Sequence, residues 1–437
     1  MKKARFYLII IALCLLSACT GPSLRYKKSI IGSMDEGSFD KAAAIVEKNK
    51  SKQYGNKNAV LYYLDLSTGQ NSAYDNQSSA KSLTSALEIT EDLSVKSASA
   101  ALGTLIINDN TVPYNPPVYE QALMHFFLAM DYLYGPYPAD SLVEANRAVF
   151  LLDNNREKQN KELYNDDAFV QYFASMIFED NAKLSDARIA RSNAENAYKK
   201  QSESRARMPQ VYLPSNYKDL GEAVIFHYNG KAPIKISKSL MLAWDNIWFA
   251  VQDNNDLKGT GQDIIDAVYA GAFGKSITIS MPEYKDVGYH IKSSAVSADG
   301  GPLEKTTLVS DISWAAKQTL KQNMPAIYMR TATRAATKYI LSVQARHIAQ
   351  KNGGDTMGTI VGSLFSIVSN VSEKADTRSW FTLPAEIRMA NLFLTPGSHN
   401  IKLVLFNADG QAIDEYVFEN VQISKGKRTY LYHRTSK

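Results

Sequence analysis

The stretch Tyr119–Tyr134, YEQALMHFFLAMDYLY, decides the fold of the first half of the chain. Its apolar residues recur at helical spacing until Gly135 and Pro136 break the pattern, and a second helical pattern resumes over residues 141–152. Two amphipathic segments joined by so short a break predict a helical hairpin. Comparable patterns dominate the surrounding sequence, so we expect a helical domain over residues 27–207.

A segment upstream indicates that such hairpins repeat. Residues 37–42, GSFDKA, are typical of the turn and second-helix start of a tetratricopeptide hairpin. Glycines recur at Gly37, Gly69, Gly103 and Gly135, with spacings of 32, 34 and 32 residues, close to the tetratricopeptide period of about 34. Only the first glycine has the matching neighbours. We therefore expect a degenerate tetratricopeptide-like array, with a plain irregular helical domain as the alternative.

The second half of the chain carries strand patterns. Residues 208–220 lose apolar periodicity and contain two prolines, which predicts a linker. The remainder, 221–437, predicts a mixed α/β domain. It begins with alternating segments at 223–228 and 234–236 around the dipeptide Asn229-Gly230, which is typical of a β-hairpin turn.

Later elements complete this domain. Asp311 is placed to cap a helix that runs through Asn323, and Met324-Pro325 is typical of the start of a second, longer helix. The chain then ends in strand patterns separated by turn residues, which predict a meander over 386–394, 399–406, 411–418 and 427–433. The expected fold class is α+β multidomain: a helical-repeat, tetratricopeptide-like array followed by a mixed α/β domain with a small antiparallel β-sandwich or sheet.

The N-terminus carries a targeting signal. Three basic residues precede an apolar run of about eleven residues, which is too short for a bilayer-spanning helix of about 20. The tetrapeptide Leu16-Ser17-Ala18-Cys19 resembles the lipobox of bacterial lipoproteins. That resemblance implies a signal peptide over 1–18, lipidation of Cys19 and a lipidated tether over 19–26. The alternative is an ordinary signal peptide cleaved after Ala18. Thr20, where inner-membrane retention uses Asp, favours the outer membrane and a protein that faces the periplasm.

Composition narrows the function classes. Removal of the basic signal residues takes the net charge from +5 to about +2, which gives no case for nucleic acid as a partner. The chain has two cysteines, Cys14 in the signal and Cys19 at the lipidation site. The mature protein would therefore have no thiol for a disulfide, a zinc cluster or cysteine catalysis.

Two segments of the second domain are candidate binding elements. Arg330, Arg334 and Lys338 fall within about 80° of one another when projected at about 100° per residue, so they form a cationic stripe on one helix face. This stripe could meet anionic headgroups or an acidic partner, or it could be a solvated face. The apolar segment Met357–Val371 reads as a core or docking helix, with an interfacial element and a loop as alternatives.

No pattern in the sequence predicts catalysis. The six histidines show no paired metal spacing, and His125 and His347 lie on apolar helix faces, where a hydrogen-bonded core histidine is the ordinary reading. The segment Gly271–Ser276 resembles the end of a phosphate-binding loop, but its first glycine is missing and a strand pattern follows. Asp376 and Arg378 are at strand spacing and would form a structural ion pair on one sheet face, with a general acid and its pKa-tuning partner as the alternative. We expect no catalytic residues, no metal ligands and no small-molecule cofactor.

Several short motifs together resemble a family of uncharacterised bacterial outer-membrane lipoproteins. They are Tyr119-Glu120, Val143–Arg147, Gly221–Val224, Asn229–Pro233, Asp311-Ile312, Pro325–Lys338, Ala375–Trp380, Leu383-Pro384 and Pro396–His399. Asn146 departs from the pattern, because a second charged residue is expected there. The resemblance implies an envelope lipoprotein working beside curli-export-like lipoproteins, and it does not imply an activity.

These observations favour a membrane-anchored periplasmic lipoprotein that binds other proteins in envelope assembly or secretion. Its partners would be envelope proteins, together with the membrane through the lipid on Cys19. The alternatives are a hydrolase or transferase acting on an envelope polymer, with a site that sequence does not reveal, and a purely structural spacer.

Overall fold

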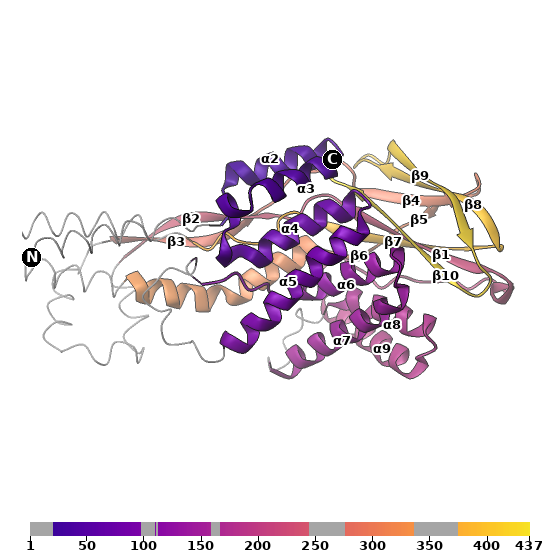
Figure 1. Ribbon diagram of the computed structural model, residues 1–437, viewed down its shortest axis with the longest axis horizontal. Helices are drawn as coiled ribbons and strands as arrows, with labels where there is room; N and C mark the ends of the chain where they lie inside the picture. Colours follow the sequence, from indigo (N-terminus) through magenta and orange to yellow (C-terminus); the bar gives the residue numbers. More distant parts are fainter. Residues whose placement is uncertain (1–20, 98–109, 111, 159–166, 244–275, 336–374) are drawn as a thin grey trace, which may run out of the picture.

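Helices cover one side of a β-structure in the computed structural model (Figure 1), which describes residues 21–97, 110, 112–158, 167–243, 276–335 and 375–437. The mixed α+β class expected from the sequence is confirmed. Within these residues no helix combines the length and apolar character needed to cross a bilayer. Cys19, Lys338, His347 and the segment Met357–Val371 lie outside the described residues.

The first half of the chain is helical. Its α-helices are α2 (Leu24–Asp35), α3 (Phe39–Lys48), α4 (Ala59–Ser72), α5 (Asn76–Ser97), α6 (Val118–Tyr134), α7 (Ser141–Lys158), α8 (Ala168–Asp180) and α9 (Leu184–Lys200). Short turns of other helix types lie at Lys50–Tyr54, Asn56–Asn58, Pro138–Asp140 and Tyr217–Asp219. The predicted hairpin is confirmed as α6 and α7. The first helix begins at Leu24, inside the segment expected to be a tether.

The four glycines of the proposed repeat do not occupy equivalent positions. Gly37 lies in the turn between α2 and α3 with a φ of +75°, a conformation that glycine adopts without strain. Gly69 lies within α4, where an added Cβ would come 2.9 Å from the Cβ of Ala43 on α3. Gly135 follows α6 in extended conformation, and Gly103 lies outside the described residues. Glycine spacing alone is therefore no sign of a repeat in this chain.

The strands of the described residues form three sheets. They are β1 (Gly221–Asn229), β2 (Ile234–Ala243), β3 (Ser276–Lys285), β4 (Ser293–Ala298), β5 (Glu304–Lys305), β6 (Thr307–Ser310), β7 (Glu386–Leu394), β8 (Gly397–Phe406), β9 (Ala412–Ile423) and β10 (Arg428–Thr435). The order is β10-β1-β7-β6 in one four-stranded sheet and β5-β4-β8-β9 in the other, and β2 and β3 form a two-stranded ribbon. A further helix spans residues 312–335.

Alternation along β1 organises the layers. Val224, Phe226 and Tyr228 belong to the core shared with the helices, whereas Ala223 and Ile225 belong to a second core shared with the β4–β8–β9 sheet. Successive side chains of a strand point to opposite faces of the sheet. The β1 sheet is therefore a middle layer, and β1 carries apolar side chains on both of its faces. The result is three layers: helices, the β1 sheet and the β8 sheet.

The sequence patterns predicted three connections wrongly. β1 and β2 form no hairpin: Gly230 has the expected positive φ of +71°, but β1 pairs with β7 and β10, and β2 pairs with β3. The last four strands are no meander, because β7 and β10 lie in a different sheet from β8 and β9. Met324 and Pro325 lie inside one continuous helix over 312–335. Asp311 does cap that helix, accepting a hydrogen bond from the Trp314 backbone N–H at 3.1 Å.

The helical layer and the β1 sheet share one hydrophobic core. Phe126 of α6 contacts Phe226 of β1, with ring centroids 5.8 Å apart, and Phe173 of α8 packs on the same ring. Four alanines of α9 (Ala187, Ala190, Ala194 and Ala197), spaced three or four residues apart, are buried and let the helix pack closely. The segment 208–220 therefore connects two parts whose apolar side chains are interleaved.

Candidate binding groove

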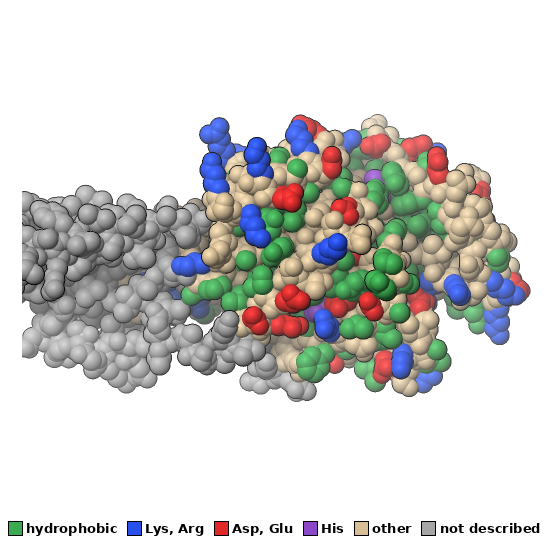
Figure 2. Space-filling view, in the orientation of Figure 1, with side chains coloured by type: hydrophobic (Ala, Val, Ile, Leu, Met, Phe, Trp, Pro, Cys, Tyr) green, Lys and Arg blue, Asp and Glu red, His purple; other side chains and the backbone are tan. Residues whose placement is uncertain are grey.

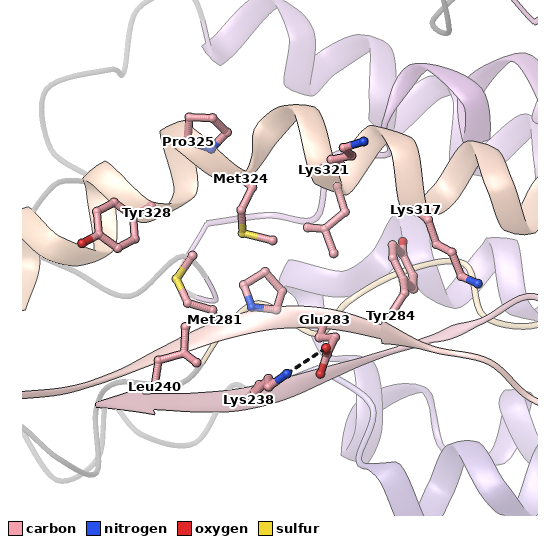
Figure 3. Close-up of a pocket in the computed structure, with 12 residues that line it drawn as sticks. Lys238, Leu240, Met281, Glu283, Tyr284, Lys317, Lys321, Met324, Pro325 and Tyr328 are labelled. Atoms are coloured by element: carbon pink, nitrogen blue, oxygen red, sulfur yellow. Dashed lines mark hydrogen bonds and ion pairs between the residues drawn. The ribbon is translucent and has the colours of Figure 1, made fainter. Parts of the chain in front are cut away.

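A groove opens between the β2–β3 ribbon and the helix over residues 312–335, with a volume of about 670 Å³ (Figure 3). The helix runs above the ribbon, and side chains from both elements point into the space between them. Among the described strands, β2 and β3 pair only with each other. The ribbon therefore has to rely on neighbouring elements to cover its faces, and along this face the cover is incomplete.

The groove is lined by apolar side chains from both elements. Leu320, Met324 and Tyr328 recur every four residues and so lie on one face of the helix. Leu240 of β2 and Met281 of β3 lie opposite them, with Leu240 36% exposed and Met281 5% exposed. Methionine is flexible and polarisable, and it adapts to apolar partners of irregular shape. This lining is suited to binding an apolar segment.

The rim of the groove is basic. Lys238 pairs with Glu283 across the ribbon at 3.0 Å, and Lys317 pairs with Asp286 at 2.6 Å. Lys321, one helical turn after Lys317, is exposed and has no ion-pair partner within the part of the chain that the structure describes. Exposed pairs of this kind contribute little to stability, and they leave Lys321 as the rim cation that a ligand can pair with.

Tyr284 closes the inner end of the groove and joins it to a buried polar network. Burial raises the pKa of the Tyr284 hydroxyl, although the neighbouring Lys235 opposes the rise. Lys235 donates a hydrogen bond to the Arg378 carbonyl at 2.9 Å, and its ammonium lies 5.4 Å from the Tyr284 ring centroid. Burial alone would lower the pKa of Lys235, but the nearby Tyr284 and Asp376 raise it above the ordinary value. This lysine therefore stays charged.

The network holds residues 375–385, the linking segment that leads into β7. Arg378 binds Asp376 through two hydrogen bonds of 2.8 and 2.9 Å and donates a third, at 2.8 Å, to the Val112 carbonyl. The Trp380 backbone N–H donates to Glu120 at 3.1 Å. The expected ion pair is thus confirmed, although it lies outside any strand. Such contacts fix the segment without secondary structure of its own.

The acids of this network are held by hydrogen bonds within the fold. Burial alone would raise the pKa of Asp376, but the hydrogen bonds and charge of Arg378 hold it below its ordinary value. Burial raises the pKa of Glu120, which accepts hydrogen bonds from Tyr114 and Tyr119. Both carboxyl groups are engaged within the fold. Their role is to position the linking segment.

The candidate residues of the cationic stripe have different surroundings. Arg330 is exposed, whereas Arg334 is only 4% exposed and its guanidinium donates to the Thr331 hydroxyl at 3.3 Å. Since Lys338 lies outside the described residues, the stripe as a whole stays a prediction. The groove lies earlier on the same helix.

Sequence reasoning missed the groove residues. The four-residue spacing of Leu320, Met324 and Tyr328 was present in the sequence, but reading Pro325 as a helix start divided it. Met281 joins them only through the β2–β3 register. His125, in contrast, was predicted correctly as a satisfied core residue, with its Nδ1 2.7 Å from a Glu144 carboxylate oxygen.

Among the residues in the described ranges, no three His, Cys, Asp or Glu side chains form a cluster that could hold a metal ion. Comparisons with protein-family models, with curated proteins and with solved structures find no match to this chain. The candidate site therefore stands on its own geometry.

Proposed function

We propose that this chain is a lipid-anchored envelope protein, acylated on Cys19, that binds a protein partner in the periplasm through the groove. The observation that carries the proposal is the open apolar lining from two elements with the exposed cation Lys321 at its rim, because such a surface suits an apolar segment with acidic margins. Its occupant is an apolar segment of another envelope protein with acidic residues at its margin. Leu320, Met324 and Tyr328 would contact its apolar side chains, and Lys321 its carboxylates.

The proposal includes the outer membrane as location and a helical region derived from tetratricopeptide-like hairpins. The lipobox-like tetrapeptide and Thr20 support the first. The α2–α3 hairpin, with its positive-φ Gly37, supports the second. The non-equivalent positions of the other glycines count against a regular repeat.

Site-specific crosslinking in cells tests the partner. A photoreactive phenylalanine analogue at Tyr328 should give a discrete adduct with an envelope protein, whereas the same analogue at Phe150, an exposed position on α7, should not. Lys321→Glu should reduce the adduct because it repels an acidic margin, and Lys183→Glu, at an exposed site elsewhere, serves as its charge-matched control. Equal adducts at Tyr328 and Phe150, or none at either, would contradict the proposal.

Metabolic labelling tests the anchor separately. Incorporation of labelled palmitate should occur in the natural chain and disappear in Cys19→Ser. Labelling that persists in this variant would place the lipid on a residue other than Cys19.

A further inference from the structure

A second cavity lies between β2 and α2, with a volume of about 660 Å³. This is within the usual range of small-molecule sites, about 300 to 1,000 Å³. In Figure 1, α2 lies on one side of the β2–β3 ribbon and the helix over 312–335 on the other, so a different helix completes the wall of each space.

Lysines dominate the polar lining of this cavity. Lys27, Lys28, Lys235 and Lys285 contribute to its wall. Lys28 and Lys285 are exposed, and neither makes an ion pair with any residue in the described ranges. Two acids also line it, but each has a cation of its own: Asp35 pairs with Lys231 and Asp286 with Lys317, both at 2.6 Å. Lys235 belongs to the buried network described above, so the excess positive charge of this cavity comes from Lys28 and Lys285.

Lys27 stands out because it is only 2% exposed. Its ammonium donates one hydrogen bond, to the Thr377 carbonyl at 2.8 Å, and lies 5.4 Å from the Phe381 ring centroid. Burial lowers the pKa of Lys27 to about 8. An ammonium has three donors, and the nearby buried Asp65 opposes the effect of burial on its pKa, so Lys27 is a cation beside the Thr377 wall of the cavity with one hydrogen bond among the described residues.

The remaining wall is apolar and comes from both sides. Leu24 and Ile31 of α2 face Ile234 and Ile236 of β2. A small inorganic anion would leave such a surface unused, whereas a ligand with a phosphate next to a glycerol and acyl chains would contact the lysines and the apolar wall together.

The cavity also lies at the end of the molecule expected to be nearest the membrane. Pro22 is part of its wall, and Cys19 is three residues earlier, a distance of at most about 10 Å along an extended chain. Figure 2 shows basic side chains over α2 and α3, near the end from which the β2–β3 ribbon projects in Figure 1. Anionic bilayers attract basic residues held close to their surface.

We infer that this cavity binds the phosphate headgroup of an anionic phospholipid, with Lys28 and Lys285 at its mouth and Lys27 at its base. The orientation of the site toward the bilayer rests on the proposed anchoring at Cys19. Headgroup binding would hold the protein in one orientation, with the groove at a fixed height above the membrane.

Vesicle binding by the unacylated mature chain carrying Cys19→Ser tests the inference without the anchor. Co-sedimentation with vesicles of equal parts phosphatidylglycerol and phosphatidylcholine should exceed that with phosphatidylcholine alone. The double variant Lys28→Gln/Lys285→Gln should weaken the phosphatidylglycerol affinity by about tenfold. Because both residues are exposed, this variant should retain the natural melting temperature.

The matched control is Lys48→Gln/Lys52→Gln, which removes two exposed lysines of the neighbouring α3 region that do not line the cavity. Equal losses in the two double variants would show diffuse surface attraction and overturn the cavity assignment. Unchanged binding in Lys28→Gln/Lys285→Gln would also overturn it. If soluble glycerol phosphate binds but the protein does not co-sediment with phosphatidylglycerol vesicles, the ligand is a free organophosphate and the lipid assignment is wrong. These results are independent of palmitate labelling and of partner crosslinking, so each proposal fails separately.

Discussion

Asp131 shows how a single buried carboxyl group makes the stability of this fold depend on pH. It lies on α6, is 1% exposed, and accepts a hydrogen bond from the Asn71 amide at 2.7 Å. Burial raises its pKa from 3.8 to about 8. Between these values the folded protein holds a proton that the unfolded chain has released. Stability therefore falls as pH rises through this window, with a limiting slope of about 1.4 kcal/mol per pH unit for one proton.

We predict that Asp131→Asn removes this contribution. The unfolding free energy of the natural chain should fall more steeply from pH 5 to pH 8 than that of the variant, because asparagine cannot ionise. Urea unfolding at each pH measures both slopes. Asp140→Asn, which replaces an exposed acid after the same helix, is the control. Its unfolding free energy should fall with pH as steeply as that of the natural chain. Parallel curves for Asp131→Asn and the natural chain would show that the buried carboxyl does not hold the extra proton.

At the scale of elements, the approach of α3 to α4 depends on a missing side chain. A Cβ on Gly69 would lie 2.9 Å from the Cβ of Ala43 and 3.0 Å from its backbone nitrogen, closer than packed atoms allow. Gly32, also within a helix, has no atom within 4 Å of its virtual Cβ. Substitution by alanine should therefore change the unfolding free energy differently at these two positions.

We predict that Gly69→Ala lowers the unfolding free energy by about 1–3 kcal/mol through overpacking, even though alanine favours helix. Gly32→Ala should be neutral or raise it by about 0.5–1 kcal/mol. Chemical denaturation of both variants measures the contrast. Adding Ala43→Gly to Gly69→Ala should recover part of the loss, because it removes the nearest contact. If Gly69→Ala is as stable as the natural chain, the two helices are not in close contact.

Local patterns predicted elements better than their pairing. The apolar periodicity of α6 predicted both of its ends to within one residue, and Asp311 was recognised as a cap. The partners of β1 could not be read locally, because β10 follows it by about two hundred residues and pairs in parallel. Likewise the left-handed Gly230 was expected, but a turn residue does not say whether the next strand returns to the same sheet.

The candidate groove shows the same limit. Its helical side is periodic in sequence. Its strand side depends on the register between β2 and β3, which are separated in sequence by residues 244–275. The lysines of the second cavity come from α2, β2 and β3, and no spacing in sequence links them. Sites assembled from separate elements therefore escaped the sequence analysis, whereas interactions within one short segment, such as Asp376 with Arg378, did not.

At the scale of the whole molecule, the helical half and the β-rich half are joined by their core. Phe126 and Phe173 of the helices surround Phe226 of β1, and Tyr228 of β1 stacks on Tyr432 of β10 with centroids 5.3 Å apart. The linking segment adds polar contacts to both halves. Neither half could bury these side chains alone, so separating them would expose a large apolar surface.

We predict that the two halves unfold together. Far-ultraviolet circular dichroism, dominated by the helices, and the fluorescence of the four tryptophans, which include Trp380 between the halves, should give coincident denaturation curves. A fragment of residues 221–437 expressed alone should lack dispersed amide resonances. Phe126→Ala, which opens a cavity of the core at this interface, should shift both curves equally, by about 3–5 kcal/mol. Tyr137→Ala, at an exposed ring after the same helix, should shift neither. Two separate transitions, or a fragment that folds by itself, would instead mean that the contacts between the halves contribute little, and the chain would then behave as two independent domains.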